Sequence, residues 1–274
     1  MRARRLGQRI RDLRERAGLG PDEAAARLGW SRPKLVRFET ATAVPRLAQV
    51  TAMCELYGAA SDQQALFIQL ASDAGKRGWW TAYGDVLTGS YVADEAEAVQ
   101  IRTWEPLLVP GLLQTEQYAW AVIEAGRPDN PDDAQRRVMA RMARRTLLSR
   151  PDAPELTAIM DEAALRRPVG GTAAMRDQLG ELLRPRDNVT IRVIPFTVGV
   201  HPGLEGGFVL LDFPAETTFP TEVYAECIAG DLYPESADEI ARISLAYERI
   251  ADAALPPDRS AELIRRIIEE FPST

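Results

Sequence analysis

The chain has very little histidine and cysteine, which limits the chemistry that it can carry out. It holds one histidine, His201, and two cysteines, Cys54 and Cys227, in 274 residues. The absence of Cys-x-x-Cys and His-x-x-x-His pairs argues against a zinc site. No Gly-x-Ser-x-Gly elbow and no P-loop occur either. We therefore expect no enzyme, with no catalytic residue, no metal and no cofactor.

Long apolar runs are missing as well. No stretch approaches the roughly 18 consecutive apolar residues of a membrane-spanning helix, so no membrane partner is expected. The N-terminal sequence "MRARRLGQRIRDLRERAG" is charged and has no apolar centre, so it is no secretory signal. The distant cysteines indicate buried thiols rather than a disulfide. Together these features predict a cytoplasmic protein. A loop position is favoured for His201 over a ligand site.

Charge is distributed unevenly along the chain. The net charge is −7, but residues 1–58 carry +6 and the remainder carries −13. A basic unit attracts polyanions such as nucleic acid. The sequence therefore predicts a small basic unit joined to a larger acidic one.

The basic unit has the pattern of four or five short helices. Its first helix carries apolar residues at helical spacing: Leu6, Ile10, Leu13 and Ala17. Gly18 is suited to end that helix. A second helix over "GPDEAAARLG" stops at Gly29, and a third begins after Ser31 as its N-cap. Two short helices joined by a glycine turn form a helix-turn-helix.

The third helix has a face suited to DNA. If Leu35 and Phe38 point inward, then Arg32, Val36 and Arg37 point outward, where a recognition helix meets the major groove. Arginine is the side chain best matched to guanine. Lys34 and Arg46 are expected near phosphates. The predicted DNA-binding residues are Ser31, Arg32, Pro33, Lys34, Val36, Arg37 and Arg46. The alternative interpretation of these charges is a solvated helix face.

The stretch "RRLGQRIRDLRERAGLGPDEAAARLGWSRPKLVRFETATAVP" resembles the lambda-repressor-like (XRE-type) helix-turn-helix family. The matching positions are Ala25, Leu28, Gly29, Ser31, Phe38 and Glu39. The resemblance implies that Glu39 pairs with Arg14, a structural role for that arginine. Two positions depart from the family: Gly20-Pro21 replaces a usual Ser-Gln pair that holds a phosphate, and Ala41 replaces a usual glycine.

The acidic remainder changes from helical to strand-like patterns. We expect a helix-turn-helix domain over 1–60, a linker helix within 61–79 and an α+β domain over 80–274. Helices are predicted over 61–77, 91–104, 114–125, 131–149, 171–183, 236–251 and 258–270, and strands over 155–162, 188–196, 206–213 and 221–228. The fold class is therefore mainly α and α+β, with a small β-α-β-β-β sheet flanked by helices.

Long motifs in this remainder resemble a second family. They are "EAEAVQIRTWEPLLVPGLLQTEQYA", "MDEAALRRPVGG", "VTIRVIPFTVGVHPGLEGGFVLLDF" and "EVYAE". They are similar to the DUF5753 domain of antitoxin-like transcriptional regulators of actinobacteria. The resemblance implies a transcriptional regulator whose partner is a small DUF397-type protein.

The acidic domain also offers candidate binding residues outside regular patterns. They are Trp79, Trp80, Tyr83, Tyr91, Trp104, Leu112 and Tyr118. Such residues can anchor a protein partner, line a small-molecule pocket or simply fill the core. Because one recognition helix reads only a few base pairs, we also expect a homodimer on a palindromic double-stranded DNA site.

Overall fold

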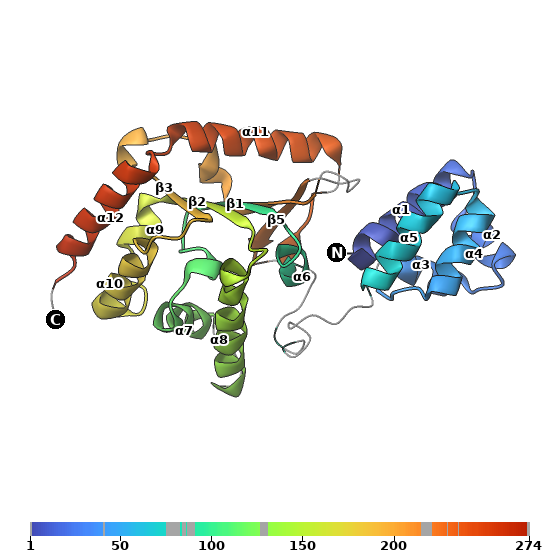
Figure 1. The fold of residues 1–274 in the computed structure, drawn as a ribbon, viewed down its shortest axis with the longest axis horizontal. Coiled ribbons are helices and arrows are strands. Elements are labelled where there is room, and N and C mark those ends of the chain that lie inside the picture. The colour runs from blue at the N-terminus through green and yellow to red at the C-terminus, as the bar shows by residue number, and fades with distance from the viewer. Residues whose placement is uncertain are drawn as a thin grey trace. The chain divides into compact units, whose positions relative to one another are not determined.

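The computed structural model describes residues 2–274 apart from 41, 75–82, 84–85, 87–90, 127–130, 215–220, 229, 235 and 273–274. The chain divides into two compact units, Met1–Thr81 and Ala82–Thr274. Figure 1 labels helices and strands of both units.

The described part of the N-terminal unit forms five helices around one small core. They are α1 (Arg2–Arg16), α2 (Pro21–Arg27), α3 (Arg32–Glu39), α4 (Leu47–Tyr57) and α5 (Ser61–Ala74). The core draws side chains from every helix, including Leu6, Ile10, Ala24, Leu35, Met53 and Phe67. The expected apolar stripe of α1 is therefore buried as predicted, apart from Ala17, which is exposed at the end of the helix.

The turn between α2 and α3 follows from local sequence. Gly20 is the N-cap of α2, Pro21 opens it, and Leu28 ends it. Gly29 then adopts a φ of 68°, a left-handed conformation that costs glycine little. Ser31 is the N-cap of α3, although its side chain makes no capping hydrogen bond.

Helix α5 lies where a linker helix is expected, but it packs into the N-terminal core. Phe67 and Ala71 are buried there, and α5 contacts both α1 and α4. Its apolar face thus completes the core of the first unit.

The C-terminal unit is built on a mixed sheet. Six strands in the described residues have the order β3-β2-β1-β4-β5-β6. They are β1 (Gln100–Glu105), β2 (Glu155–Asp161), β3 (Val189–Ile194), β4 (Phe208–Asp212), β5 (Thr221–Cys227) and β6 (Gly230–Leu232). The first three run parallel to one another, and β4, β5 and β6 each pair antiparallel to the strand before them in the sheet.

Helices cover both faces of this sheet, as Figure 1 shows. Helix α11 (Ala237–Ala253) covers one face, where Tyr247 and Ile250 pack on Trp104 and Leu210. The opposite face carries α7 (Glu116–Ala125), α10 (Gly171–Leu182) and α12 (Pro257–Glu270), with α8 (Pro131–Arg145) packed on α7. Two short helices, α6 (Tyr91–Glu95) and α9 (Glu162–Arg166), complete the unit. Among the described residues, no helix is long and apolar enough to cross a membrane.

One sequence prediction is wrong. The expected helix over 91–104 is instead the short α6 followed by β1, a central strand paired with β2 and β4. Ile101 and Trp104, three residues apart, mimic helical spacing, but they belong to the hydrophobic clusters on opposite faces of the sheet. The four predicted strands are confirmed as β2 to β5, and β1 and β6 add to them.

Candidate functional site

Helix α3 presents the face expected of a recognition helix. Leu35 is fully buried and Phe38 is 6% exposed, so these two side chains fix α3 on the core. Ser31, Arg32, Pro33 and Arg37 are exposed, and Val36 and Lys34 are half-buried. Each of these predicted positions at the start of and along α3 is therefore at least partly accessible to solvent.

Nearby groups hold two of these cations in place. Arg32 lies 3.6 Å from the carboxylate of Asp22 in the first turn of α2, and both side chains are largely exposed. The Lys34 ammonium lies 4.4 Å from the ring centroid of Trp30, which packs edge-on against Phe38. A cation over an indole face is attracted by the ring. Lys34 is thereby tied to the turn that precedes α3.

Arg37 and Arg46 extend freely from the basic unit. Within the described part of the chain, neither guanidinium has an ion-pair partner, and both residues are exposed. Arg46 is the N-cap of α4, and its backbone N–H donates to Oε1 of Gln49 at 2.8 Å. Its backbone is thus fixed while its charge remains available to an anion.

A buried ion pair attaches α1 to the end of α3. Nε and Nη2 of Arg14 donate to the two carboxylate oxygens of Glu39 at 2.7 and 2.9 Å, and Nη1 donates to the carbonyl of Leu19 at 2.8 Å. The side chains are only 4% and 6% exposed. The hydrogen bonds to Glu39 are the first cause of the raised pKa of Arg14. The predicted structural pairing of Arg14 with Glu39 is confirmed.

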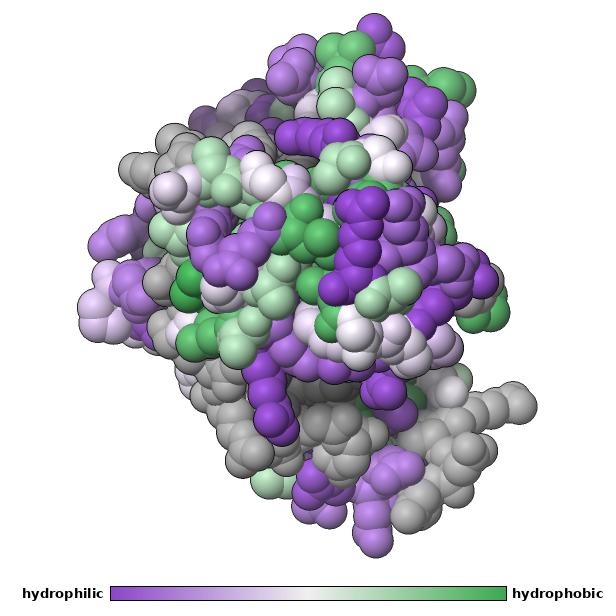
Figure 2. Space-filling model, turned by 90° about the vertical axis from the view of Figure 1, so that its right-hand side faces the viewer, coloured by the Kyte–Doolittle hydropathy of each residue, from purple (hydrophilic) through white to green (hydrophobic). Residues whose placement is uncertain are grey.

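Figure 2 gives a space-filling view of one side of the molecule. Hydrophilic residues predominate on the face in view, and hydrophobic residues lie scattered among them.

Three of the candidate binding residues in the acidic domain are core residues. Trp104 is fully buried, and its indole N–H donates to the carbonyl of Gly203 at 2.8 Å. Tyr118 is fully buried, with its hydroxyl accepting from the N–H of Val109, and Leu112 is 4% exposed. For Trp104 and Tyr118 the structure supports core packing, and the expectation that these two face a ligand or partner is corrected. Leu112 packs in the core and also lines a second pocket, of about 240 Å³.

The other candidates have different positions. Trp79 and Trp80 lie outside the described residues. Tyr83 is half-buried, and Tyr91 is half-buried with its ring stacked at 4.0 Å on that of Tyr224. Tyr91 also lines the larger pocket of the C-terminal unit.

His201 is buried in the loop between β3 and β4. Its Nδ1 accepts from the N–H of Gly203, its Nε2 lies 3.5 Å from Asp161, and its ring packs edge-on against Trp104. A Cβ on Gly203 would lie 2.4 Å from the Trp104 ring, so the loop can approach the indole only with glycine there. These contacts hold the loop against Trp104. His201 is thus a loop residue, as expected.

The same loop exposes apolar side chains that sequence reasoning missed. They are Phe196, Val198, Val200 and Leu204, with exposed fractions from 36% to 90%. Apolar residues within a stretch punctuated by glycine and proline were the available signal.

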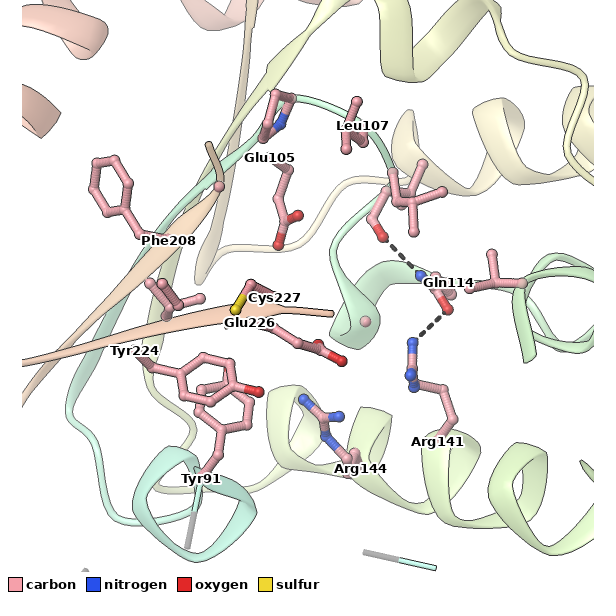
Figure 3. Close-up of a pocket in the computed structure, with 18 of the residues that line it drawn as sticks. Tyr91, Glu105, Leu107, Gln114, Arg141, Arg144, Phe208, Tyr224, Glu226 and Cys227 are labelled. Atoms are coloured by element: carbon pink, nitrogen blue, oxygen red, sulfur yellow. Dashed lines mark hydrogen bonds between the residues drawn. The ribbon is translucent and has the colours of Figure 1, made fainter. Parts of the chain in front are cut away.

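A pocket of about 500 Å³ lies beside the carboxyl end of β1. Its walls come from the loop after β1, from α8, from β4 and from the end of β5, as Figure 3 shows. Apolar side chains such as Leu107, Val122 and Phe208 line it together with charged ones.

Acidic and basic groups both face this pocket. Arg144 pairs with Glu95 through two hydrogen bonds of 3.0 and 2.8 Å. Arg141 donates from Nη1 to Oε1 of Gln114 at 2.8 Å. Burial lowers the pKa of Arg141 to about 10, aided by the charge of Arg144. Glu105 accepts from the Thr103 hydroxyl at 3.0 Å, and burial raises the pKa of Glu105 to about 7.

Sequence reasoning did not single out Glu105, Arg141 or Arg144. Glu105 is the last residue of β1. The two arginines lie on α8, about 40 residues further along the chain, and both line the pocket. The available signal was an acidic residue directly before the apolar loop "PLLVPG", and the arginine spacing of three on α8.

Neither metal chemistry nor a disulfide is indicated in the described residues. No group of three or more His, Cys, Asp or Glu side chains there is placed to hold a metal ion. Both cysteines are free thiols. Cys54 is buried, and burial raises its pKa to about 11. Cys227 is exposed at the end of β5, so the expectation that both thiols are buried is wrong for that residue.

Comparison with known proteins agrees with this division into two units. A family model described as a helix-turn-helix domain matches residues 5–67. A second, described as a domain of unknown function, DUF5753, matches residues 88–266. No similar protein was found among curated proteins or among solved structures. A helix-turn-helix domain is the DNA-binding part of a regulator, so the chain is a DNA-binding regulator. It belongs to the DUF5753 family and carries an XRE-type helix-turn-helix domain at its N-terminus.

Proposed function

We propose that this protein is a transcriptional regulator that reads a specific duplex DNA sequence with α3. The exposed face of α3, next to the buried anchors Leu35 and Phe38, carries this proposal. Arg32 and Arg37 contact base edges in the major groove, where each can donate two hydrogen bonds to a guanine. Val36 lies between them and offers an apolar contact to a thymine methyl group.

The surrounding groups hold the DNA backbone. Lys34 and Arg46 contact phosphates, and Ser31 and Pro33 at the start of α3 lie against the same backbone. Phosphate contacts fix the register of a protein on DNA without reading sequence. Asp22 holds Arg32 in the free protein, and this pair opens when Arg32 engages a base.

The regulator acts as a homodimer on a palindromic operator. Two recognition helices double the number of base pairs that are read, with half-sites about 34 Å apart. The dimer contacts belong to the C-terminal unit, because the negative charge of that unit keeps it from the DNA and two basic units repel each other at close range.

The C-terminal unit receives the regulatory signal and catalyses no reaction. Its main partner is a small DUF397-type protein, as the family resemblance implies. The exposed loop residues Phe196, Val198, Val200 and Leu204 support a protein partner, because grouped exposed apolar side chains are typical of interaction sites. The alternative is a unit that senses a small molecule, and the pocket beside Glu105 and Arg141 supports that alternative.

DNA binding is tested by fluorescence anisotropy of the full chain on an operator obtained by genome-wide mapping of bound DNA. Arg37→Ala should weaken binding by about 1–3 kcal/mol and relax specificity at one position. Arg46→Ala should weaken binding to all DNA sequences alike. It should also reduce the slope of log K against log salt concentration by about one unit. The control is Arg259→Ala, which removes an exposed arginine from α12 in the acidic unit. If Arg32→Ala and Arg37→Ala both bind the operator as tightly as the wild type does, the assignment of α3 as the recognition helix is wrong.

The protein partner is tested separately by calorimetry of the full chain with the small protein encoded beside it. Binding should occur and should weaken when Val200 and Leu204 are both replaced by serine. Absence of heat with the small protein, together with an unchanged operator affinity in its presence, would remove the protein partner and favour the small-molecule alternative.

A further inference from the structure

The pocket of the C-terminal unit contains a cation whose charge is not balanced by a direct partner. Among the described residues, the Arg141 guanidinium has one hydrogen-bond partner, the neutral Gln114 amide, and no carboxylate within ion-pair distance. Arg141 is half-buried on the pocket wall, and its lowered pKa reflects the loss of water around it. A cation removed from water without an anion is costly. An anionic group in the pocket would lower this cost.

The neighbouring cation, Arg144, differs from Arg141 because it already has a carboxylate partner. Its guanidinium is held by Glu95, which is only 2% exposed, and it lies over the Tyr91 ring at 5.4 Å. The charge of Arg144 is therefore balanced by Glu95, and Arg141 is the cation of this wall that lacks a carboxylate partner. A Cβ on Gly111 would lie 3.4 Å from Nη1 of Arg141 and 3.7 Å from Nη2 of Arg144, so glycine there leaves both guanidiniums close to the loop.

Glu105 is the complementary group on another wall of the same pocket. Figure 3 shows its carboxylate directed into the space between β4, β5 and α8. Its Oε1 accepts from the Thr103 hydroxyl, and in the described residues it has no arginine or lysine partner within ion-pair distance. Glu226, at the exposed end of β5, lines the same pocket and adds negative charge. This wall could therefore accept a hydrogen-bond donor or a cationic group from a ligand.

The remaining lining is largely apolar and gives the pocket its size. Leu107, Val122 and Phe208 contribute apolar surface, and stacked Tyr91 and Tyr224 close one side. A volume of about 500 Å³ falls within the range of small-molecule sites. It suits a ligand of about dipeptide size and not a folded domain.

We propose that this pocket binds a small zwitterionic ligand of dipeptide size, with its acidic group on Arg141, its amino group on Glu105 and an apolar body against Leu107 and Phe208. Binding brings each charge of the ligand to a protein group that has no ion-pair partner of opposite charge in the free pocket. A regulatory effect of the ligand on DNA rests on the proposed function, whereas binding itself does not.

The test is calorimetry of the full chain without DNA, so its result is independent of operator binding. The probes are phenylalanyl-leucine, its N-acetyl form, its C-terminal amide and the form with both ends blocked. These four share one apolar body and differ in the groups at their two ends, which carry or lack a charge. Phenylalanyl-leucine should bind best, and each single blocking step should weaken binding about tenfold or more, as expected for loss of a charged hydrogen bond.

Variants then assign each end of the ligand. Arg141→Gln should weaken binding of phenylalanyl-leucine and of its N-acetyl form, while the amide is unaffected. Glu105→Gln should instead weaken the binding of phenylalanyl-leucine and of its amide, while binding of the N-acetyl form is unaffected. Arg137→Gln, exposed on α8 and not among the pocket-lining residues, is the matched control and should bind as the wild type does.

Two results would overturn the proposal. One is the absence of heat from all four probes. The other is equal binding of the doubly blocked probe and phenylalanyl-leucine, which would show that the charges play no part. Both are measured on the wild-type chain, so they hold even where a variant fails to fold.

Discussion

The buried pair of Arg14 and Glu39 should make a large contribution to the stability of the N-terminal unit. Glu39→Ala removes the acceptor of two hydrogen bonds from a guanidinium that is 4% exposed. The carboxylate that remains near it is that of Glu15, which lies 3.6 Å away and is 53% exposed. Removing one partner of a buried ion pair costs about 3–5 kcal/mol. For a domain of this size, 1 kcal/mol corresponds to about 4–8 °C in Tm. A loss of about 3 kcal/mol therefore lowers the melting temperature of the N-terminal unit by about 12–24 °C. Glu39→Gln keeps a neutral acceptor and should lose less.

The matched control is the pair of Arg27 and Glu23 on α2. Its nitrogen and oxygen lie 2.7 Å apart, as in the buried pair, but its side chains are 54% and 51% exposed. An exposed pair contributes about 0–1 kcal/mol, so Glu23→Ala should shift the melting temperature little. The assay is thermal unfolding of the full chain by calorimetry and circular dichroism. The reasoning would be refuted if Glu39→Ala melted within about 2 °C of Glu23→Ala.

Three further changes should give distinct results. The folded-state pKa of Glu105 is about 7, above its ordinary 4.5, so the folded chain binds more protons between these values. Stability that Glu105 contributes is therefore present at low pH and lost as pH rises through about 7. Denaturant titrations from pH 5 to 8 should show a decline in the wild type that is smaller in Glu105→Gln; parallel curves would contradict this. Gly203→Ala should destabilise the C-terminal unit by about 1–3 kcal/mol, because the new Cβ would lie 2.4 Å from the Trp104 ring; an unchanged melting temperature would refute that contact. Gly180→Ala in α10, whose Cβ would meet nothing within 4 Å, should stabilise by about 0.5–1 kcal/mol in the same melting assay, and a lower melting temperature would contradict it.

The helix-turn-helix could be predicted from the sequence because its signals are local. Gly29 in the turn, Ser31 before α3 and the inward pair Leu35 and Phe38 lie within ten residues of one another. Short-range caps and spacings of this kind fix helix ends. The pairing of Arg14 with Glu39 came from the family resemblance, since nothing in residue spacing alone joins α1 to α3.

Strand β1 shows why the rest could not be predicted. It is short, and its partners β2 and β4 come from about 50 and 110 residues further along the chain. The sequence of residues 100–105 alone does not indicate that both faces of this strand are buried. Its helix-like spacing was therefore the stronger local signal.

The pocket depends on distant segments in the same way. Glu105, Arg141 and Tyr224 belong to β1, α8 and β5, and only the tertiary fold brings these elements together. The exposed loop around Val200 was also missed, because an apolar residue in sequence is expected to be buried, whereas Val200 is 90% exposed.

The central claim is that α3 reads DNA sequence, and selection of binding sites from a random pool of duplex DNA tests it most directly. The wild-type chain should enrich a palindromic motif with half-sites about one helical turn apart. The double variant Arg32→Ala and Arg37→Ala, with its folding verified by circular dichroism, should enrich no such motif. Recovery of the same motif by both proteins, or of none by the wild type, would contradict the account.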